Sequence, residues 1–119
     1  MDHELLHKET STLLQYNQEL QNIYLEVIDK GQPADFFSIV KPFADKVKVV
    51  LDRWEESALK WVKTDKPKYF HRQQIDNMVE NITTVSVQAF FPDTKGKRFK
   101  ELIRSNQYTL ENILQLLQK

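Results

Sequence analysis

Apolar residues recur every three, four or seven positions along most of this 119-residue chain, which is the spacing of one face of an α-helix. Four stretches carry the pattern and predict helices at approximately residues 3–30, 36–63, 68–90 and 95–118, with a break near 41–42. The stripes to be buried are, in chain order, Leu6, Leu13, Tyr16, Leu20, Ile23 and Val27; Phe43, Val47, Val50, Trp54, Ala58 and Trp61; Ile75, Met78, Val79, Ile82, Val85 and Ala89; and Phe99, Leu102, Ile103, Asn106, Leu110, Ile113 and Leu117.

Short connections make consecutive helices antiparallel neighbours. The pattern therefore predicts an all-α fold, an up-and-down antiparallel four-helix bundle, with residues 1–119 as a single domain. A helical hairpin that dimerises is the main alternative. Asn81 and Asn106 fall close to the predicted core, and a hydrogen bond between them would fix the register of the helices.

Composition removes several classes of function. The two glycines are isolated, so no glycine-rich loop can hold a phosphate or a dinucleotide. The absence of cysteine excludes disulfides, thiolate zinc sites and cysteine nucleophiles. Lys+Arg and Asp+Glu both total 17, so net charge gives no general attraction to nucleic acid or anionic membrane. The first thirty residues contain no apolar run long enough for a signal peptide or membrane span, and we expect a cytoplasmic protein without a cofactor.

The most suggestive motif is His3-Glu4-Leu5-Leu6-His7, which fits the H-E-x-x-H pattern of zinc peptidases. It also contains the Glu-x-x-His spacing of carboxylate-bridged di-metal sites. The peptidase motif lacks its third ligand, and the chain holds no second Glu-x-x-His pair. We therefore expect His3 and His7 to be solvated, with Glu4 complementing the helix dipole.

His71 extends the third apolar stripe backward, so its ring is expected to face inward near one end of the bundle. That end also holds the start of the first helix, where His3 and His7 lie. One interpretation is a half-buried histidine bonded to a carbonyl or carboxylate. The other is a weak metal or anion site that His71 forms with His3 or His7, in a cluster with Lys68, Tyr69 and Arg72.

Basic residues gather in two clusters, which are Lys66, Lys68 and Arg72, and Lys95, Lys97, Arg98, Lys100 and Arg104. The topology places them at opposite ends of the bundle, so they do not make one continuous stripe for nucleic acid. Basic residues in a first helical turn oppose the helix dipole, so Lys97 and Arg98 hint at an anionic partner. Nucleic-acid binding through residues 95–104 is therefore a further hypothesis, beside the simpler one of a solvated surface.

From Asp35 onward, distinctive residues follow one another in the order Asp35-Phe36-Phe37, Lys41-Pro42, Trp54, Pro67-Lys68-Tyr69, His71, Gln74-Ile75, Arg98-Phe99-Lys100 and Tyr108-Thr109-Leu110. This order resembles the YppE-like family of small proteins from Bacillus and related Gram-positive bacteria. The resemblance covers about three-quarters of the chain and does not include His3, Glu4 or His7. It implies a four-helix bundle and no activity, because the family has no established one.

These observations favour a non-catalytic protein-interaction module, a monomer or weak homodimer, that binds an unknown protein partner. The expectation rests on the incomplete catalytic motifs and on a fold that offers grooves between helices. A metal or anion site near His71 and nucleic-acid binding are the alternatives. The residues expected on the interaction surface are Lys68, Tyr69, His71, Arg72, Lys97, Arg98 and Lys100.

Overall fold

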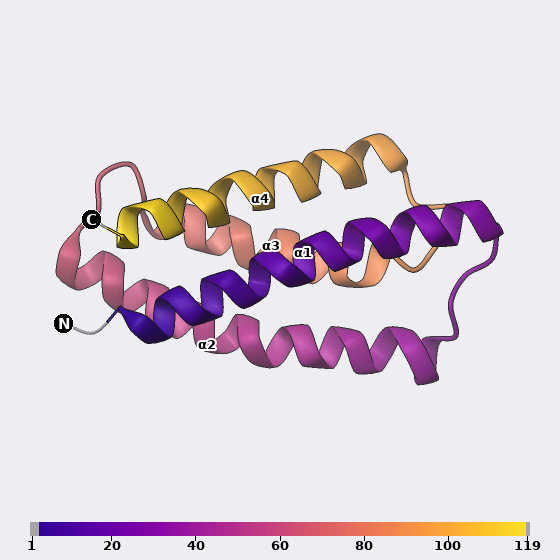
Figure 1. The fold of residues 1–119 in the computed structure, drawn as a ribbon, viewed down its shortest axis with the longest axis horizontal. Coiled ribbons are helices and arrows are strands. Elements are labelled where there is room, and N and C mark those ends of the chain that lie inside the picture. Colours follow the sequence, from indigo (N-terminus) through magenta and orange to yellow (C-terminus); the bar gives the residue numbers. More distant parts are fainter. Residues whose placement is uncertain (1–2, 119) are drawn as a thin grey trace.

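The computed structural model describes residues 3–118 and is an all-α bundle, as predicted (Figure 1). Residues 1 and 119, the predicted domain limits, lie outside the described part. None of the helices within residues 3–118 is long and apolar enough to cross a membrane. The helices are α1 (Glu4–Lys30), α2 (Lys41–Asp65), α3 (Arg72–Gln88) and α4 (Gly96–Leu117), and a π-helical turn, η1 (Phe36–Val40), runs directly into α2.

The helices form a closed ring, because α1 packs against α4 and α2, while α3 packs against α2 and α4. The bundle measures 47 by 26 by 21 Å. One end holds the start of α1, the connection 66–71 and the last turn of α4 (Figure 1). We call it the histidine end, since all three histidines belong to it. The opposite end, the η1 end, holds η1 and the connection 89–95.

Helix α3 begins at Arg72, four residues later than the predicted start at 68. The preceding connection contains two non-glycine residues in the left-handed region, Lys66 (φ 47°) and Tyr69 (φ 67°). This path turns Phe70 into the core, where its ring lies 5.4 Å from that of Trp61. Residues 68–71 therefore do not belong to the helix, because the backbone at Tyr69 is left-handed and that at His71 is extended.

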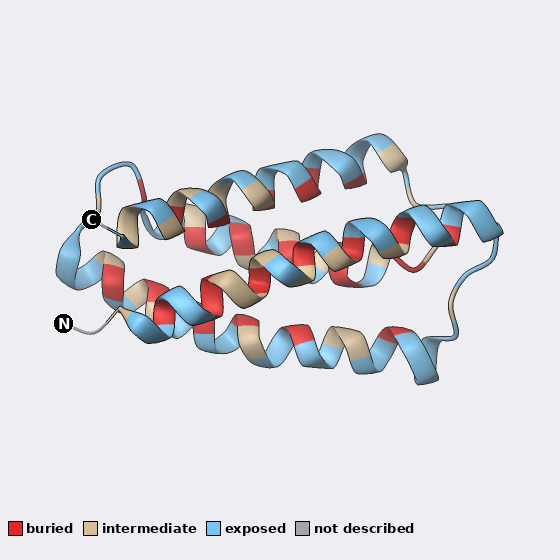
Figure 2. Cartoon of the chain, in the orientation of Figure 1, coloured by how far each residue is buried: buried red, intermediate tan, exposed pale blue. Residues whose placement is uncertain are grey.

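The inward faces of all four helices are buried (Figure 2). At the centre, Trp54 is fully buried, and its Nε1 donates a hydrogen bond to the Thr10 hydroxyl (3.0 Å), which ties α2 to α1. Toward the η1 end, the ring of Tyr24 packs on Phe99 with a centroid distance of 4.3 Å. The Tyr24 hydroxyl donates to the carbonyl of Thr94 (2.9 Å), so a buried ring also anchors the connection between α3 and α4.

Buried polar side chains join α1 to α4. Asn106 Nδ2 donates to Asn17 Oδ1 (3.1 Å), and Asn17 Nδ2 donates to the Ile103 carbonyl (2.9 Å). The predicted Asn81–Asn106 pair is therefore wrong, because α4 turns Asn106 toward α1 while Asn81 lines a recess between α3 and α4. The buried Glu9 carboxylate has no hydrogen-bond partner within residues 3–118, which nothing in the structure explains.

Candidate functional site

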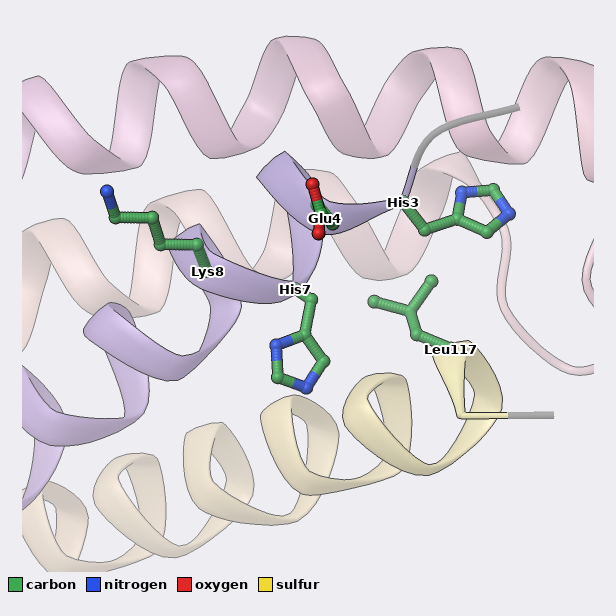
Figure 3. Close-up of a pocket in the computed structure, with 5 residues that line it drawn as sticks. All are labelled: His3, Glu4, His7, Lys8 and Leu117. Carbon is green, nitrogen blue, oxygen red and sulfur yellow. The ribbon is translucent and has the colours of Figure 1, made fainter.

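The His3–His7 stretch lies at the histidine end, where the first turn of α1 meets the last turn of α4. An open recess of about 600 Å³ there is lined by His3, Glu4, His7, Lys8 and Leu117 (Figure 3). The His7 imidazole points toward α4, whereas the His3 imidazole points away, beyond Leu117 (Figure 3). His3 Nε2 lies 2.8 Å from Oδ2 of Asp65, at the end of α2. The two imidazoles therefore do not converge on a common point.

His71 is exposed, so the prediction of an inward-facing ring is wrong. The residue has an extended backbone (φ −129°, ψ 172°) and precedes the first residue of α3. Its backbone N–H donates to Oε1 of Gln74 (2.8 Å), which fixes the start of the helix. Within residues 3–118, no group of three His, Asp or Glu side chains could hold a metal ion. His3, His7 and His71 share an end of the bundle without forming a ligand set.

The other residues predicted at this end form an exposed corner rather than a cavity. Tyr69 is 75% exposed, and Lys68 Nζ lies 5.2 Å from the centre of its ring. Arg72 Nε is 3.9 Å from Oδ2 of Asp76, a solvated pair one turn along α3. The left-handed backbone at Tyr69 follows from turning Phe70 into the core and needs no ligand to account for it.

The second basic cluster lies at the η1 end, on the first turns of α4 (Figure 1). Lys97, Arg98 and Lys100 are exposed, and none of them is ion-paired within residues 3–118. Phe99 is fully buried, so it is unable to stack on a base. Arg98 also lines a polar recess of about 490 Å³ between α3 and α4. The two predicted basic groups thus lie at opposite ends, as the topology indicated.

The turn η1 exposes three large apolar side chains, and the sequence reasoning did not identify them as a site. The exposed fractions are 47% for Phe36, 79% for Phe37 and 49% for Ile39. The two phenylalanine rings meet edge to face at 5.2 Å, and the fully buried Val40 anchors the turn. The available signal was the run from Phe36 to Val40, four apolar residues in five with no helical period.

An apolar recess of about 350 Å³ lies beside these side chains. It is formed between the end of α1, the connection that follows and the start of α2, and Ile39 belongs to its wall. The exposed Glu26 and Lys30 of α1 also line it. We call the three exposed side chains of η1 and this recess the η1 surface. The other apolar lining residues are Ile23, Val27, Pro33, Ala34, Phe43 and Phe90.

Hydrogen bonds from Ser38 to Asp35 fix the start of η1. Asp35 Oδ2 accepts from the Ser38 hydroxyl (2.6 Å) and from the Ser38 backbone N–H (2.8 Å). These bonds favour the ionised carboxylate and lower the pKa of Asp35 below its ordinary value of 3.8. The turn that presents Phe36 and Phe37 is therefore held at both ends, by Asp35 at its start and by Val40 in the core.

Comparison with known proteins places the chain in a family. The family model described as "Bacterial domain of unknown function (DUF1798)" matches residues 10–117. The chain belongs to this family. It is 29% identical over 111 residues to the uncharacterised protein YppE of Bacillus subtilis, covering 87% of this chain and 90% of that one. The predicted YppE-like resemblance is confirmed.

Solved structures agree in fold. A Listeria innocua protein of unknown function is 31% identical, with a TM-score of 0.90, covering 95% of this chain and 90% of that one. The crystal structure of Bacillus subtilis YppE has a TM-score of 0.91 at 27% identity, covering 98% and 95%. These relatives are described as uncharacterised or of unknown function. The family match begins at Thr10, so the η1 surface lies inside it and the His3–His7 motif outside.

Proposed function

We propose that this protein is a non-catalytic interaction module that binds another protein at the η1 surface. The observation that supports the proposal is the exposure of Phe37, at 79%, beside Phe36 and the recess that Ile39 helps to form. Contiguous exposed apolar groups mark interaction sites, whereas single ones are ordinary. Aromatic anchors next to a pocket also contribute most of the binding energy in many protein interfaces.

The basic residues predicted for the interaction surface have a smaller part in this proposal. Lys97, Arg98 and Lys100 belong to the same end as η1, where their charge would attract an acidic partner and raise its association rate. Lys68, Tyr69, His71 and Arg72 lie at the far end of a 47 Å bundle, so a partner confined to the η1 surface would not contact them. The metal or anion site near His71 and nucleic-acid binding through residues 95–104 stay predictions.

The proposal includes the absence of catalysis and a location in the cytoplasm. The absence of catalysis is supported by the separation of the groups that a catalytic site would need: His3 pairs with Asp65, and the exposed His71 precedes α3. An exposed apolar surface of this kind binds proteins without needing an acid, a base or a metal. Cell fractionation of the native host with an antibody to the chain checks the location.

Site-specific photo-crosslinking in the native host tests the proposal. A benzoylphenylalanine replaces Phe37 in one variant and Tyr108 in the matched control, since Tyr108 is 73% exposed on the outer face of α4. We expect a discrete product between the 14.2 kDa chain and another protein from position 37 and none from position 108. Adding Ile39→Ser to the position 37 variant should reduce this product. Equal products from both positions, or none from position 37, would contradict the proposal.

A further inference from the structure

We infer that a second copy of this chain docks on the η1 surface, so that the protein forms a two-fold symmetric homodimer there. The inference rests on the proposed use of this surface for protein binding, and it identifies the bound protein as a second copy of the chain. A two-fold contact needs a face that is complementary to itself, because each group meets its complement on the other copy. The η1 surface carries a protrusion and a recess side by side.

The protrusion and the recess are both apolar and lie side by side. Phe36 and Phe37 project from η1, and Ile39 of the same turn lines the apolar recess. In a two-fold contact, Phe37 of each copy enters the recess of the other. Burying the exposed parts of these three side chains in both copies, with the recess walls that they cover, amounts to roughly 1,000 Å². That area is at the lower limit for a specific interface, and we expect a dimer that dissociates on dilution.

The recess carries one negative and one positive side chain, so the same face of two copies can pair opposite charges. Glu26 and Lys30 lie one turn apart on α1, and neither is ion-paired within residues 3–118. We expect the symmetric contact to bring Glu26 of one copy near Lys30 of the other, and the two-fold axis repeats this pair. The formal net charge of zero removes long-range repulsion between copies. The same face therefore supplies apolar contact and opposite charges.

The protrusion is ordered before it binds, which lowers the entropy lost on association. Asp35 accepts two hydrogen bonds from Ser38, and Val40 is fully buried behind the exposed rings. The rings of Phe36 and Phe37 already pack against each other. Only the side-chain rotamers of the protrusion remain to be fixed in the dimer.

Sedimentation equilibrium of the full chain between about 10 µM and about 1 mM tests the inference. We expect the mass to rise with concentration from 14.2 kDa toward twice that value. Phe37→Asp should raise the dimer Kd by about tenfold or more, whereas the matched Tyr108→Asp should leave it unchanged. Circular dichroism with an unchanged melting temperature confirms that both variants are folded. A mass of 14.2 kDa throughout, or a dimer indifferent to Phe37→Asp, would overturn the inference.

Charge reversal gives an independent test of the symmetric geometry. Glu26→Lys and Lys30→Glu should each raise the dimer Kd by about threefold or more, and the double variant should restore it. A double variant as weak as the single ones would refute this pairing. The crosslinking separates the two proposals: another protein captured at position 37 by a chain that stays monomeric leaves the proposed function intact and removes the dimer. Capture of a second copy alone supports the dimer and identifies the second copy as the protein that the η1 surface binds.

Discussion

The histidine end and the η1 end use adjacent aromatic side chains in opposite ways. At the histidine end, Phe70 turns into the core against Trp61, and Tyr69 adopts a left-handed backbone to allow it. At the η1 end, both Phe36 and Phe37 stay at the surface, while Val40 fills the core. The most suggestive sequence motif lies at the first end, and the exposed rings of Phe36 and Phe37 pack against each other at the second. The recognisable motif and the surface that is free to bind a partner therefore lie in different parts of the molecule.

The largest difference between the ends should appear in stability. Phe70→Ala should lower the free energy of unfolding by about 3–5 kcal/mol, because it leaves a cavity beside Trp61. Phe37→Ala, at the other end, should change it by less than about 0.5 kcal/mol, because the ring is mostly solvated. Urea denaturation followed by circular dichroism measures both. Equal losses of stability would show that the η1 rings stabilise the fold, which would contradict the difference between the two ends.

The buried hydrogen bond between Asn17 and Asn106 joins α1 to α4 midway between the two ends of the bundle. Asn106→Ala should lower the free energy of unfolding by about 1–3 kcal/mol, because Asn17 Oδ1 then loses its buried donor. Asn81→Ala is the matched control, and its expected change is below about 0.5 kcal/mol. The measurement is again urea denaturation. A loss at Asn81 as large as that at Asn106 would contradict the observed pairing.

Relieving the left-handed backbone at Tyr69 should change stability less than the substitutions above, and it should increase stability. Tyr69→Gly should raise the free energy of unfolding by up to about 1 kcal/mol, since relief of the backbone strain exceeds the entropic cost of glycine. Tyr108→Gly, at an equally exposed position inside α4, should lower it by about 0.5 kcal/mol. Thermal unfolding of both variants provides the comparison. Destabilisation by Tyr69→Gly would mean that the Tyr69 ring contributes more than its exposure indicates.

The smallest predicted effect is the pH dependence at Asp35. Its pKa is lower in the folded chain than the ordinary value of 3.8, so the ionised carboxylate stabilises the fold above that value. The contribution is lost as the pH falls through the lower, folded pKa. The stability difference between the wild type and Asp35→Asn should therefore shrink below pH 3.8. A difference that is constant between pH 6 and pH 3, in about half-unit steps of a urea titration, would exclude this role.

The sequence predicts the helices and their inward faces well where the period is regular. On α4, every predicted position from Phe99 to Ile113 is buried, because one uninterrupted helix keeps a single face toward the core. On α1, Tyr24 is buried where Ile23 was predicted, because the Tyr24 hydroxyl reaches a carbonyl that the period does not reveal. Steps from residue 20 to 27 through either 23 or 24 fit the helical period, so periodicity identifies a face without deciding which of two neighbouring residues turns inward.

Contacts between helices and the site itself were harder to predict. The helical period places Asn106 on the core side but does not say whether α1 or α3 lies opposite it. The spacing of His71 fits the apolar stripe of α3, but the helix begins only at the next residue, Arg72. The η1 surface has no helical period, and only the structure shows that Val40 points inward while Phe37 points out. Local sequence patterns therefore predict the helices better than the contacts between helices or the surfaces of the connecting turns.

Hydrogen–deuterium exchange of the full chain tests most directly whether binding occurs at the η1 end. Exchange is measured for the free chain in dilute solution and for the chain bound to the protein that crosslinks at position 37. If that protein is a second copy, the bound sample is the chain at high concentration. We predict slower exchange for amides of residues 36–40 and the end of α1, and unchanged exchange for residues 66–72. Slower exchange confined to residues 66–72, with residues 36–40 unchanged, would contradict the account.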